Sequence, residues 1–423
     1  MPDDSLPDQS VDDTDPFEEF NRAMGAGRIQ NPYPYFAEQR AKGAVLPADI
    51  RALMGLDEDT DLSQMGEIPD VFTAYSFDTV QQILRDGETF SSSGYAPVMG
   101  EVMGRTILEM DEPDHHAYRS LIQQAFTRRE MERWEVDVVE PIVDEHIDAF
   151  VDRGGTGSGN ADLVRELTFP FPVAVIAALL GLPRSDLPEF HRLAVELISV
   201  SIDYERAVRA SKQLFDYLKG IVDDRRVNRA DDMISVLAHA ELDGQRLTDD
   251  EIISFLRLLL PAGAETTYRS SSNLLFGLLT HPDQLDAVRD DRALIPQAIE
   301  EGLRWEPPLL LIQRTVMKDV EIGGMHLPAG TMVAVNVASA GHDETRWENA
   351  EDFDIFRPAQ QHLSFAFGAH MCLGMHLARM ETKVVLEKVF DRLPGVRLDP
   401  DASPPYITGM TFRSPPSLPV VWG

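Results

Sequence analysis

The stretch Phe365–Gly374, FAFGAHMCLG, holds the only cysteine of the 423-residue chain, Cys372. A single cysteine makes no internal disulfide and no four-cysteine metal site. Three readings stay open for it: a buried inert thiol, a catalytic nucleophile, or one sulfur ligand of a cofactor metal. A helix is predicted to begin near Leu373, and the backbone N–H groups of its first turn favour a thiolate.

The spacing of Phe365, Gly368, His370, Cys372 and Gly374 resembles the haem-binding signature of the cytochrome P-450 family. The resemblance implies a mainly helical fold with small β-sheets and a long central helix over the haem. It implies that the Cys372 thiolate is the axial ligand of a haem b iron, which makes it the metal ligand of the chain. Phe365 would shield the sulfur from water, and His370 would bind a haem propionate. The two glycines suit a tight turn at 368 and a close backbone approach at 374.

Composition limits the partners of the chain. Asp and Glu number 71 against 38 Lys and Arg, a formal charge of −33. This charge argues against nucleic acid and anionic membranes as partners. No apolar run reaches the ~20 residues of a membrane-spanning helix, and the N-terminus lacks a basic segment followed by an apolar one. We therefore expect a soluble, cytoplasmic protein.

Domain organisation is predicted to be simple. Residues 1–30 carry many acidic and few apolar side chains, so we expect a mobile acidic tail there. The family resemblance covers about 31–423 and implies a single domain.

The longest predicted helix runs from a capping box at Thr248 and Glu251 to about Thr280. Its middle contains Pro261, which removes one backbone donor and weakens the helix. From the residues alone, this is a kink in which the Thr266 hydroxyl bonds back to a carbonyl of the preceding turn.

The segment 262–267, AGAETT, also resembles the oxygen-activation motif of the same family. The resemblance implies that Glu265 and Thr266 form the acid–alcohol pair that passes protons to O₂ in a groove of the helix. Pro261, directly before the motif, departs from the commonest family pattern.

Three further basic positions are implied by the family. His115 and Arg119 lie four residues apart on a predicted helix that begins near Pro113. Spacing alone fits an exposed polar face. The resemblance implies that both bind a haem propionate, and that Arg314 does so as well.

Glu301 and Arg304 lie three apart on a predicted helix, a spacing that also fits an ordinary surface ion pair. The family resemblance implies a buried structural triad completed by Arg357. Such a triad would hold the region that presents Cys372.

The remaining segments carry fewer signals. Residues 91–104 look like a long loop, which the family uses to contact substrate. Short strands are expected at 71–75, 320–323 and 331–336. The candidate pocket residues are mostly apolar and favour a hydrophobic small-molecule substrate: Tyr95, Leu258, Leu259, Ala262, Leu309, Ile312 and Met410.

The function that the resemblance implies is monooxygenation, in which one atom of O₂ enters the substrate and the other leaves as water. One alternative is a peroxide-driven peroxygenase, or a haem-thiolate isomerase or dehydratase. Another is a non-enzymatic haem sensor. Glu265 and Thr266 favour the monooxygenase, because the alternatives have less use for a proton relay.

Electrons must come from a partner, because one cysteine cannot hold an iron–sulfur cluster and no flavin fingerprint is present. We expect a separate ferredoxin and its reductase, supplied by NAD(P)H. An acidic ferredoxin needs a basic patch near Cys372. The candidates are Arg128, Arg129, Arg379 and Lys383.

Overall fold

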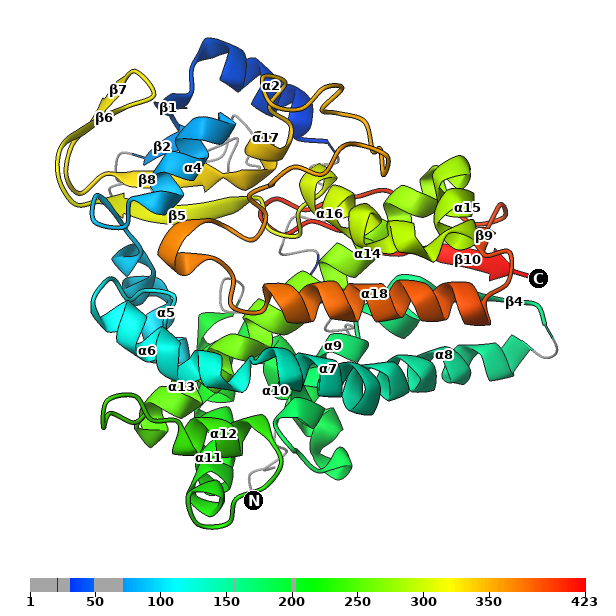
Figure 1. The fold of residues 1–423 in the computed structure, drawn as a ribbon, viewed down its shortest axis with the longest axis horizontal. Coiled ribbons are helices and arrows are strands. Elements are labelled where there is room, and N and C mark those ends of the chain that lie inside the picture. Colours follow the sequence, from blue (N-terminus) through cyan, green and yellow to red (C-terminus); the bar gives the residue numbers. More distant parts are fainter. Residues whose placement is uncertain (1–20, 22–30, 49–70, 155–156, 199–202) are drawn as a thin grey trace, which may run out of the picture.

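The computed structural model describes residues 21, 31–48, 71–154, 157–198 and 203–423. Helices form most of it, and the sheets are small (Figure 1), which confirms the predicted fold class. The α-helices are α2 (Tyr33–Lys42), α4 (Phe77–Arg85), α5 (Ala96–Met103), α6 (Asp114–Ile122), α7 (Arg128–Trp134), α8 (Glu140–Gly154), α9 (Phe171–Leu179), α10 (Leu187–Ile198), α11 (Tyr204–Val227), α12 (Met233–His239), α13 (Asp249–Leu259), α14 (Thr266–Thr280), α15 (Pro282–Asp290), α16 (Ile295–Trp305), α17 (Val337–Gly341) and α18 (Met375–Arg392).

The main sheet has the strand order β1-β2-β8-β5-β3 in the described part of the chain. Only β2 and β8 run parallel within it, and its other pairs are antiparallel. A second sheet, β4-β10-β9, ties the C-terminal strand to the segment after α8, and β6 and β7 form a hairpin. The strands are β1 (Val45–Pro47), β2 (Val71–Ala74), β3 (Phe90–Ser91), β4 (Gly159–Asp162), β5 (Leu311–Val316), β6 (Val320–Ile322), β7 (Met325–Leu327), β8 (Met332–Asn336), β9 (Arg397–Leu398) and β10 (Pro419–Trp422).

The core is organised around α14, which is buried over most of its length. α14 packs against α16 and α18, and α18 in turn packs against α8. A separate apolar cluster lies where α4 meets the main sheet. In both places, helix against helix and helix against sheet, each element buries its apolar face. This burial stabilises a mainly helical domain with a small sheet.

The predicted long helix is present over 249–280, and its middle is π-helical rather than α-helical. The capping box at Thr248 and Glu251 is present and begins α13. A π-helical turn, Leu260–Glu265, then separates α13 from α14. Pro261 lacks the N–H that an α-helix needs at this point, so the wider turn occurs where the sequence is least helical.

The prediction of a long loop over 91–104 is wrong in its second half, where α5 lies. Pro97 occupies the first turn of α5, a position that suits proline, and Gly104 ends the helix with φ of +79°. A Cβ at Gly104 would lie 2.3 Å from the Ser254 hydroxyl oxygen, so the helix must end against α13 at a glycine.

The acidic tail predicted over 1–30 lies outside the described residues, apart from Asn21. Asn21 is buried and accepts hydrogen bonds from Tyr268 (3.2 Å) and Arg269 (3.3 Å).

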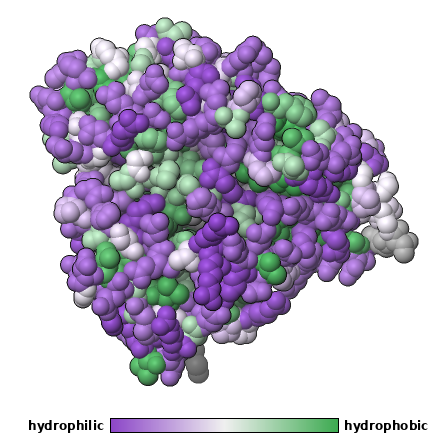
Figure 2. All heavy atoms as spheres, viewed as in Figure 1, coloured by the Kyte–Doolittle hydropathy of each residue, from purple (hydrophilic) through white to green (hydrophobic). Residues whose placement is uncertain are grey.

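Hydrophilic residues cover most of the face in Figure 2, and apolar ones gather in small separate groups. That 31–423 acts as one domain stays a prediction.

Candidate functional site

Gly368 makes the tight turn that the loop before Cys372 requires. Its φ is +76°, and a Cβ there would lie 2.5 Å from the carbonyl oxygen of Leu84. The Met371 amide donates to Gly368 (3.1 Å) and the Cys372 amide donates to Phe365 (2.9 Å). The backbone itself therefore folds the loop and fixes where the sulfur lies.

The Cys372 thiol is free, and the residue is exposed. The surrounding protein nevertheless desolvates the thiolate and raises the pKa of the thiol, and the Gly374 amide, Arg119 and Arg379 only oppose this. α18 begins at Met375, two residues later than predicted. The helix end alone therefore does not give a thiolate, whereas a bound metal cation would deprotonate the sulfur outright.

At Gly374, unlike at Gly368, the protein leaves room for a side chain. A Cβ at Gly374 would meet no protein atom within 4 Å, and the backbone there has φ of −84°. The packing of the protein therefore does not require glycine at 374. The space on that side of the residue is open to a bound group.

Basic side chains from three segments gather close to the cysteine loop. α6 supplies His115 and Arg119, β5 supplies Arg314, and the loop supplies His370. The His115 and His370 rings lie 4.2 Å apart, and Arg119 donates to the Met371 carbonyl at 2.7 Å. The structure thus brings together the four residues that the resemblance assigned to the propionates.

Of these four groups, only His115 pairs with a carboxylate in the described part of the chain, that of Glu112. Within the described ranges, neither Arg119 nor Arg314 makes an ion pair, and the buried Nε2 of His115 has no hydrogen-bond partner. Burial, together with His115 and both arginines, lowers the pKa of His370 to about 3. Burial lowers the pKa of His115 as well, despite Glu112 at 3.2 Å.

A group with one metal for the sulfur and two carboxylates for the basic cluster fits these residues. Buried arginines need an anion, and guanidinium donors suit a carboxylate. Neutral His115 and His370 can still donate N–H bonds to it. The porphyrin expected from the sequence has this combination of groups.

Thr266 lies at the junction of the π-turn and α14. Its hydroxyl donates to the Ala262 carbonyl at 2.6 Å, which is the back-bond expected from the residues alone. Ala262 is exposed and Thr266 is half-buried. The threonine oxygen is thereby oriented and keeps its acceptor lone pairs for another group.

Glu265 is buried and forms an ion pair with Arg269, one turn further along. The Arg269 Nε donates to Glu265 Oε1 at 2.6 Å. Burial raises the pKa of the Glu265 carboxyl, and the guanidinium opposes the rise. Sequence reasoning identified the glutamate and missed its partner, although the i,i+4 spacing was visible.

Sequence reasoning also missed a second buried acid, Glu381 on α18. It is 3% exposed, and Thr267 donates to it at 3.4 Å. Burial raises its pKa to about 8, although the Thr267 hydrogen bond lowers it. Nothing in the local sequence signals this environment, because α14 buries the residue from a distance of 114 positions.

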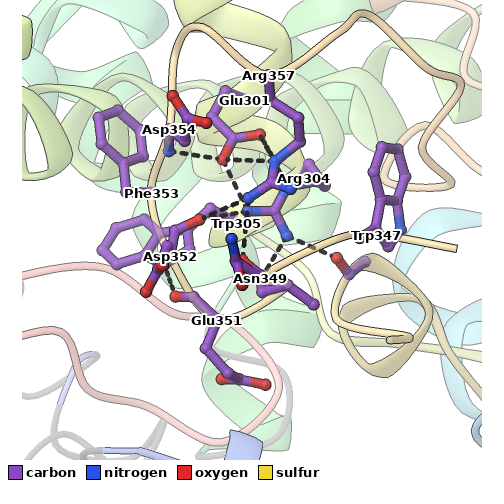
Figure 3. A network of polar contacts seen from close by, with 12 residues as sticks. Glu301, Arg304, Trp305, Trp347, Asn349, Glu351, Asp352, Phe353, Asp354 and Arg357 are labelled. Carbon is purple, nitrogen blue, oxygen red and sulfur yellow. Dashed lines mark hydrogen bonds and ion pairs between the residues drawn. The ribbon is translucent and has the colours of Figure 1, made fainter. Parts of the chain in front are cut away.

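The three residues predicted as a structural triad lie together (Figure 3). Arg304 binds both carboxylate oxygens of Glu301 at 2.7 Å, and Arg357 approaches the same carboxylate at 3.5 Å. Arg304 also donates to the carbonyls of Gly341 and Ala350. The network thus joins α16 to the chain that leads into the cysteine loop.

The predicted pocket residues come from four segments. Leu258 and Leu259 end α13, and Tyr95 accepts a hydrogen bond from the Gln313 amide at 2.8 Å. Leu309 pairs with Phe412 beside the 408–414 turn that carries Met410. The remaining two lie at the π-turn and in β5: Ala262 and Ile312.

Three of the four predicted docking cations are paired. Arg128 binds Glu132 at 2.8 Å and Lys383 binds Glu135 at 2.7 Å. Arg379 donates two hydrogen bonds to the Glu300 carboxylate, from Nε to Oε1 at 2.6 Å and from Nη2 to Oε2 at 2.8 Å. Burial alone would raise the pKa of Glu300, but Arg379 and His362 lower it to about 2. Arg129 is exposed.

No group of three or more His, Cys, Asp or Glu side chains among the described residues is arranged to hold a metal ion. None of the described helices combines the length and apolar character needed to cross a membrane.

A family model, that of cytochrome P450, matches residues 196–416. The chain is 33% identical over 373 residues to putative cytochrome P450 YjiB of Bacillus subtilis, covering 86% of this chain and 88% of the relative. It is 35% identical over 358 residues to a steroid C26-monooxygenase of Mycolicibacterium smegmatis, covering 82% and 87%. It is 32% identical over 411 residues to cytochrome P450 monooxygenase PikC of Streptomyces venezuelae, covering 95% and 93%.

Solved structures show the same architecture. CYP109E1 of Bacillus megaterium in complex with testosterone superposes with a TM-score of 0.81 at 29% identity, covering 92% of this chain and 99% of that one. CYP109Q5 of Chondromyces apiculatus also gives 0.81 at 31% identity, covering 94% and 96%.

Proposed function

The chain belongs to the cytochrome P450 family, and from this premise we propose which of its residues hold the haem and handle protons. It is a haem-thiolate monooxygenase. Cys372 is the proposed iron ligand, and the proposed propionate ligands are His115, Arg119, Arg314 and His370. The observation that carries this assignment is that Arg119, beside Cys372, and Arg314, beside His370, make no ion pair within the described ranges.

The haem supplies O₂ activation once it is bound and reduced. Thr266 is proposed to hold a hydrogen-bonded group in the helix groove, because its hydroxyl proton is committed to the Ala262 carbonyl and its lone pairs remain. Glu265 is proposed to carry toward Thr266 protons that are ultimately replaced from solvent. Its burial means that it has little direct contact with bulk water during the transfer.

The substrate is proposed to be a hydrophobic small molecule. The pocket candidates are apolar, apart from Tyr95, whose hydroxyl is already bonded. Steroids are the first class to screen, since one relative is named a steroid C26-monooxygenase and a similar structure holds testosterone.

Electrons are proposed to come from NAD(P)H through a ferredoxin reductase and a ferredoxin. Arg128 and Arg129 lie at the start of α7 and are exposed, so they are the better docking candidates. Arg128 also pairs with a carboxylate, as Arg379 and Lys383 do, but its side chain is 92% exposed, against 30% for Arg379 and 38% for Lys383. A cytoplasmic location stays a prediction.

The test is spectroscopic and catalytic. The reduced carbon monoxide adduct should show the thiolate-ligated band, and Cys372→His should convert it to an imidazole-type band. Steroid turnover should require NADH, reductase and ferredoxin. Turnover with peroxide alone at an equal rate would favour a peroxygenase, and a globin-like band in the unaltered protein would refute the thiolate assignment.

A further inference from the structure

Arg269 of α14 contacts two parts of the molecule that the proposed function uses separately. Its Nε donates to Glu265 Oε1 at 2.6 Å, and its Nη2 approaches the same oxygen at 2.5 Å. Its Nη1 donates to the Ser414 hydroxyl at 2.9 Å. One guanidinium therefore joins the acid beside Thr266 to a segment 145 positions further along the chain.

Ser414 closes the turn formed by residues 408–414. Its amide donates to Thr408 at 3.3 Å, and the Thr408 amide donates back at 3.2 Å. Inside the turn, Gly409 has φ of +116°, and a Cβ there would lie 2.1 Å from the Phe412 carbonyl oxygen. Met410, a candidate wall of the substrate pocket, lies within this turn.

The surroundings leave the guanidinium little freedom to move. Arg269 is 1% exposed, and its guanidinium carbon lies 4.7 Å from the Tyr268 ring centroid and 5.9 Å from that of Phe412. Asn21 Oδ1 accepts from Nη2 at 3.3 Å. A side chain held on several sides transmits a displacement of one neighbour to another instead of absorbing it.

We propose that Arg269 is a positioning residue that holds Glu265 for proton delivery and links it to the 408–414 turn, so that substrate seating at this turn and proton delivery are coupled. The proposal rests on the proposed roles of Glu265 and Thr266. Both close contacts end on Oε1, so the guanidinium fixes one carboxylate oxygen and sets the direction of the other.

An ordinary buried ion pair would stabilise the fold without this coupling. The two roles differ in what each variant changes. Losing the guanidinium leaves Glu265 buried without its cation, which favours the protonated carboxyl. Losing only the Ser414 hydroxyl leaves the ion pair intact and removes the hydrogen bond to the turn, while the Phe412 ring contact still joins Arg269 to it.

The experiment compares Arg269→Met, Arg269→Lys and Ser414→Ala in the haem-loaded protein with a spectrally responsive steroid. Ser272→Ala is the matched control, since Ser272 is a buried serine of α14 that bonds Thr168 at 2.7 Å. The readouts are the fraction of NADH electrons recovered in product rather than hydrogen peroxide, its pH profile, and the infrared band of a protonated carboxyl.

We expect the product fraction to fall about tenfold in Arg269→Met and about threefold in Ser414→Ala. Arg269→Lys should recover part of it. Besides the band expected from Glu381, a second carboxyl band should appear at neutral pH in Arg269→Met and disappear when Glu265→Gln is added. If Arg269→Met does not fold, Arg269→Lys and Ser414→Ala decide the matter by the same readouts.

Two outcomes separate this inference from the proposed function. If Glu265→Gln alone keeps the product fraction of the unaltered protein, the proposed proton role of Glu265 is wrong. If Glu265→Gln loses product while the Arg269 variants do not, Arg269 is structural and the inference is overturned. Equal product fractions in Ser414→Ala and Ser272→Ala would overturn the link to the turn.

Discussion

The Thr267 hydroxyl of α14 donates a hydrogen bond to the Glu381 carboxyl of α18, with 3.4 Å between the oxygens. Glu381 makes no ion pair within the described ranges and is almost fully buried. The carboxyl therefore lies between α14 and α18, the helix that follows the cysteine, in surroundings that favour its neutral form.

Stability should fall as pH rises because of Glu381. Its folded-state pKa is raised from 4.5 to about 8, so the folded protein binds this proton more tightly than the unfolded chain between those values. The expected slope is at most about 1.4 kcal/mol per pH unit. Glu381→Gln should flatten the decline in thermal midpoint from pH 5 to pH 8.

The control for Glu381→Gln is Glu348→Gln, an exposed glutamate whose replacement should leave the pH dependence unchanged. Identical slopes in the unaltered protein and Glu381→Gln would contradict the assignment.

The buried triad should be needed for a stable cysteine loop. Arg304→Met removes two 2.7 Å contacts and leaves the Glu301 charge buried beside Arg357 alone. The expected loss is about 3–5 kcal/mol of unfolding free energy, measured by denaturant titration and by the yield of haem-loaded protein. Arg128→Gln, which breaks an exposed pair, is the control and should change little. Similar stability in both variants would argue against the triad's structural role.

The two glycines of the cysteine loop should respond differently to alanine. Gly368→Ala meets both a positive φ and the Leu84 carbonyl, so we expect a loss of about 1–3 kcal/mol and a shift of the carbon monoxide band away from the thiolate form. Gly374→Ala meets no protein atom and should leave the apoprotein as stable as before. A haem-dependent defect in Gly374→Ala alone would show that the bound group occupies that side.

Arg314 should contribute to haem retention rather than to folding. Arg314→Met removes a buried cation that has no ion pair within the described ranges, so the apoprotein should be no less stable. Haem affinity should fall about 10- to 100-fold with the lost charge-assisted bond. Haem transfer to apomyoglobin measures the rate of haem dissociation, which should rise as the affinity falls. An unchanged transfer rate would remove Arg314 from the proposed propionate ligands.

Reduction by ferredoxin should depend on the start of α7. Charge reversal at Arg128 and Arg129 should slow reduction about tenfold at low salt, with the difference disappearing at high salt. Stopped-flow reduction measures it, and Lys42→Glu on α2 is the control. Unchanged rates and salt dependence would place the docking surface elsewhere.

Local sequence signals predicted local structure well. The capping box at Thr248 begins α13 as expected, and the turn at Gly368 needs the glycine that the sequence supplies. The family resemblance predicted that Glu301, Arg304 and Arg357 would meet, and they do. Spacing within one segment was informative for the capping box and the turn, whereas only the family resemblance pointed to Arg357, which lies 56 positions from Glu301.

Long-range packing was beyond the sequence. The segment predicted as a loop, 91–104, contains α5. Local sequence did not predict this helix because α5 ends against α13 at Gly104, close to Ser254, a residue 150 positions away. The burial of Glu381 by α14 and the tie from Arg269 to Ser414 arise in the same way. Neither leaves a periodicity or a motif in the residues nearby.

The π-turn at Leu260–Glu265 has a consequence for how substitutions along this helix should be interpreted. A turn of this kind takes up one more residue than an α-helical turn, so the side chains of α14 are rotated out of phase with those of α13. A single α-helical wheel drawn through 249–280 would therefore place the residues of either α13 or α14 on the wrong face of the helix. Deleting a single residue within the turn would bring the two halves into phase and turn Thr266 away from its present direction.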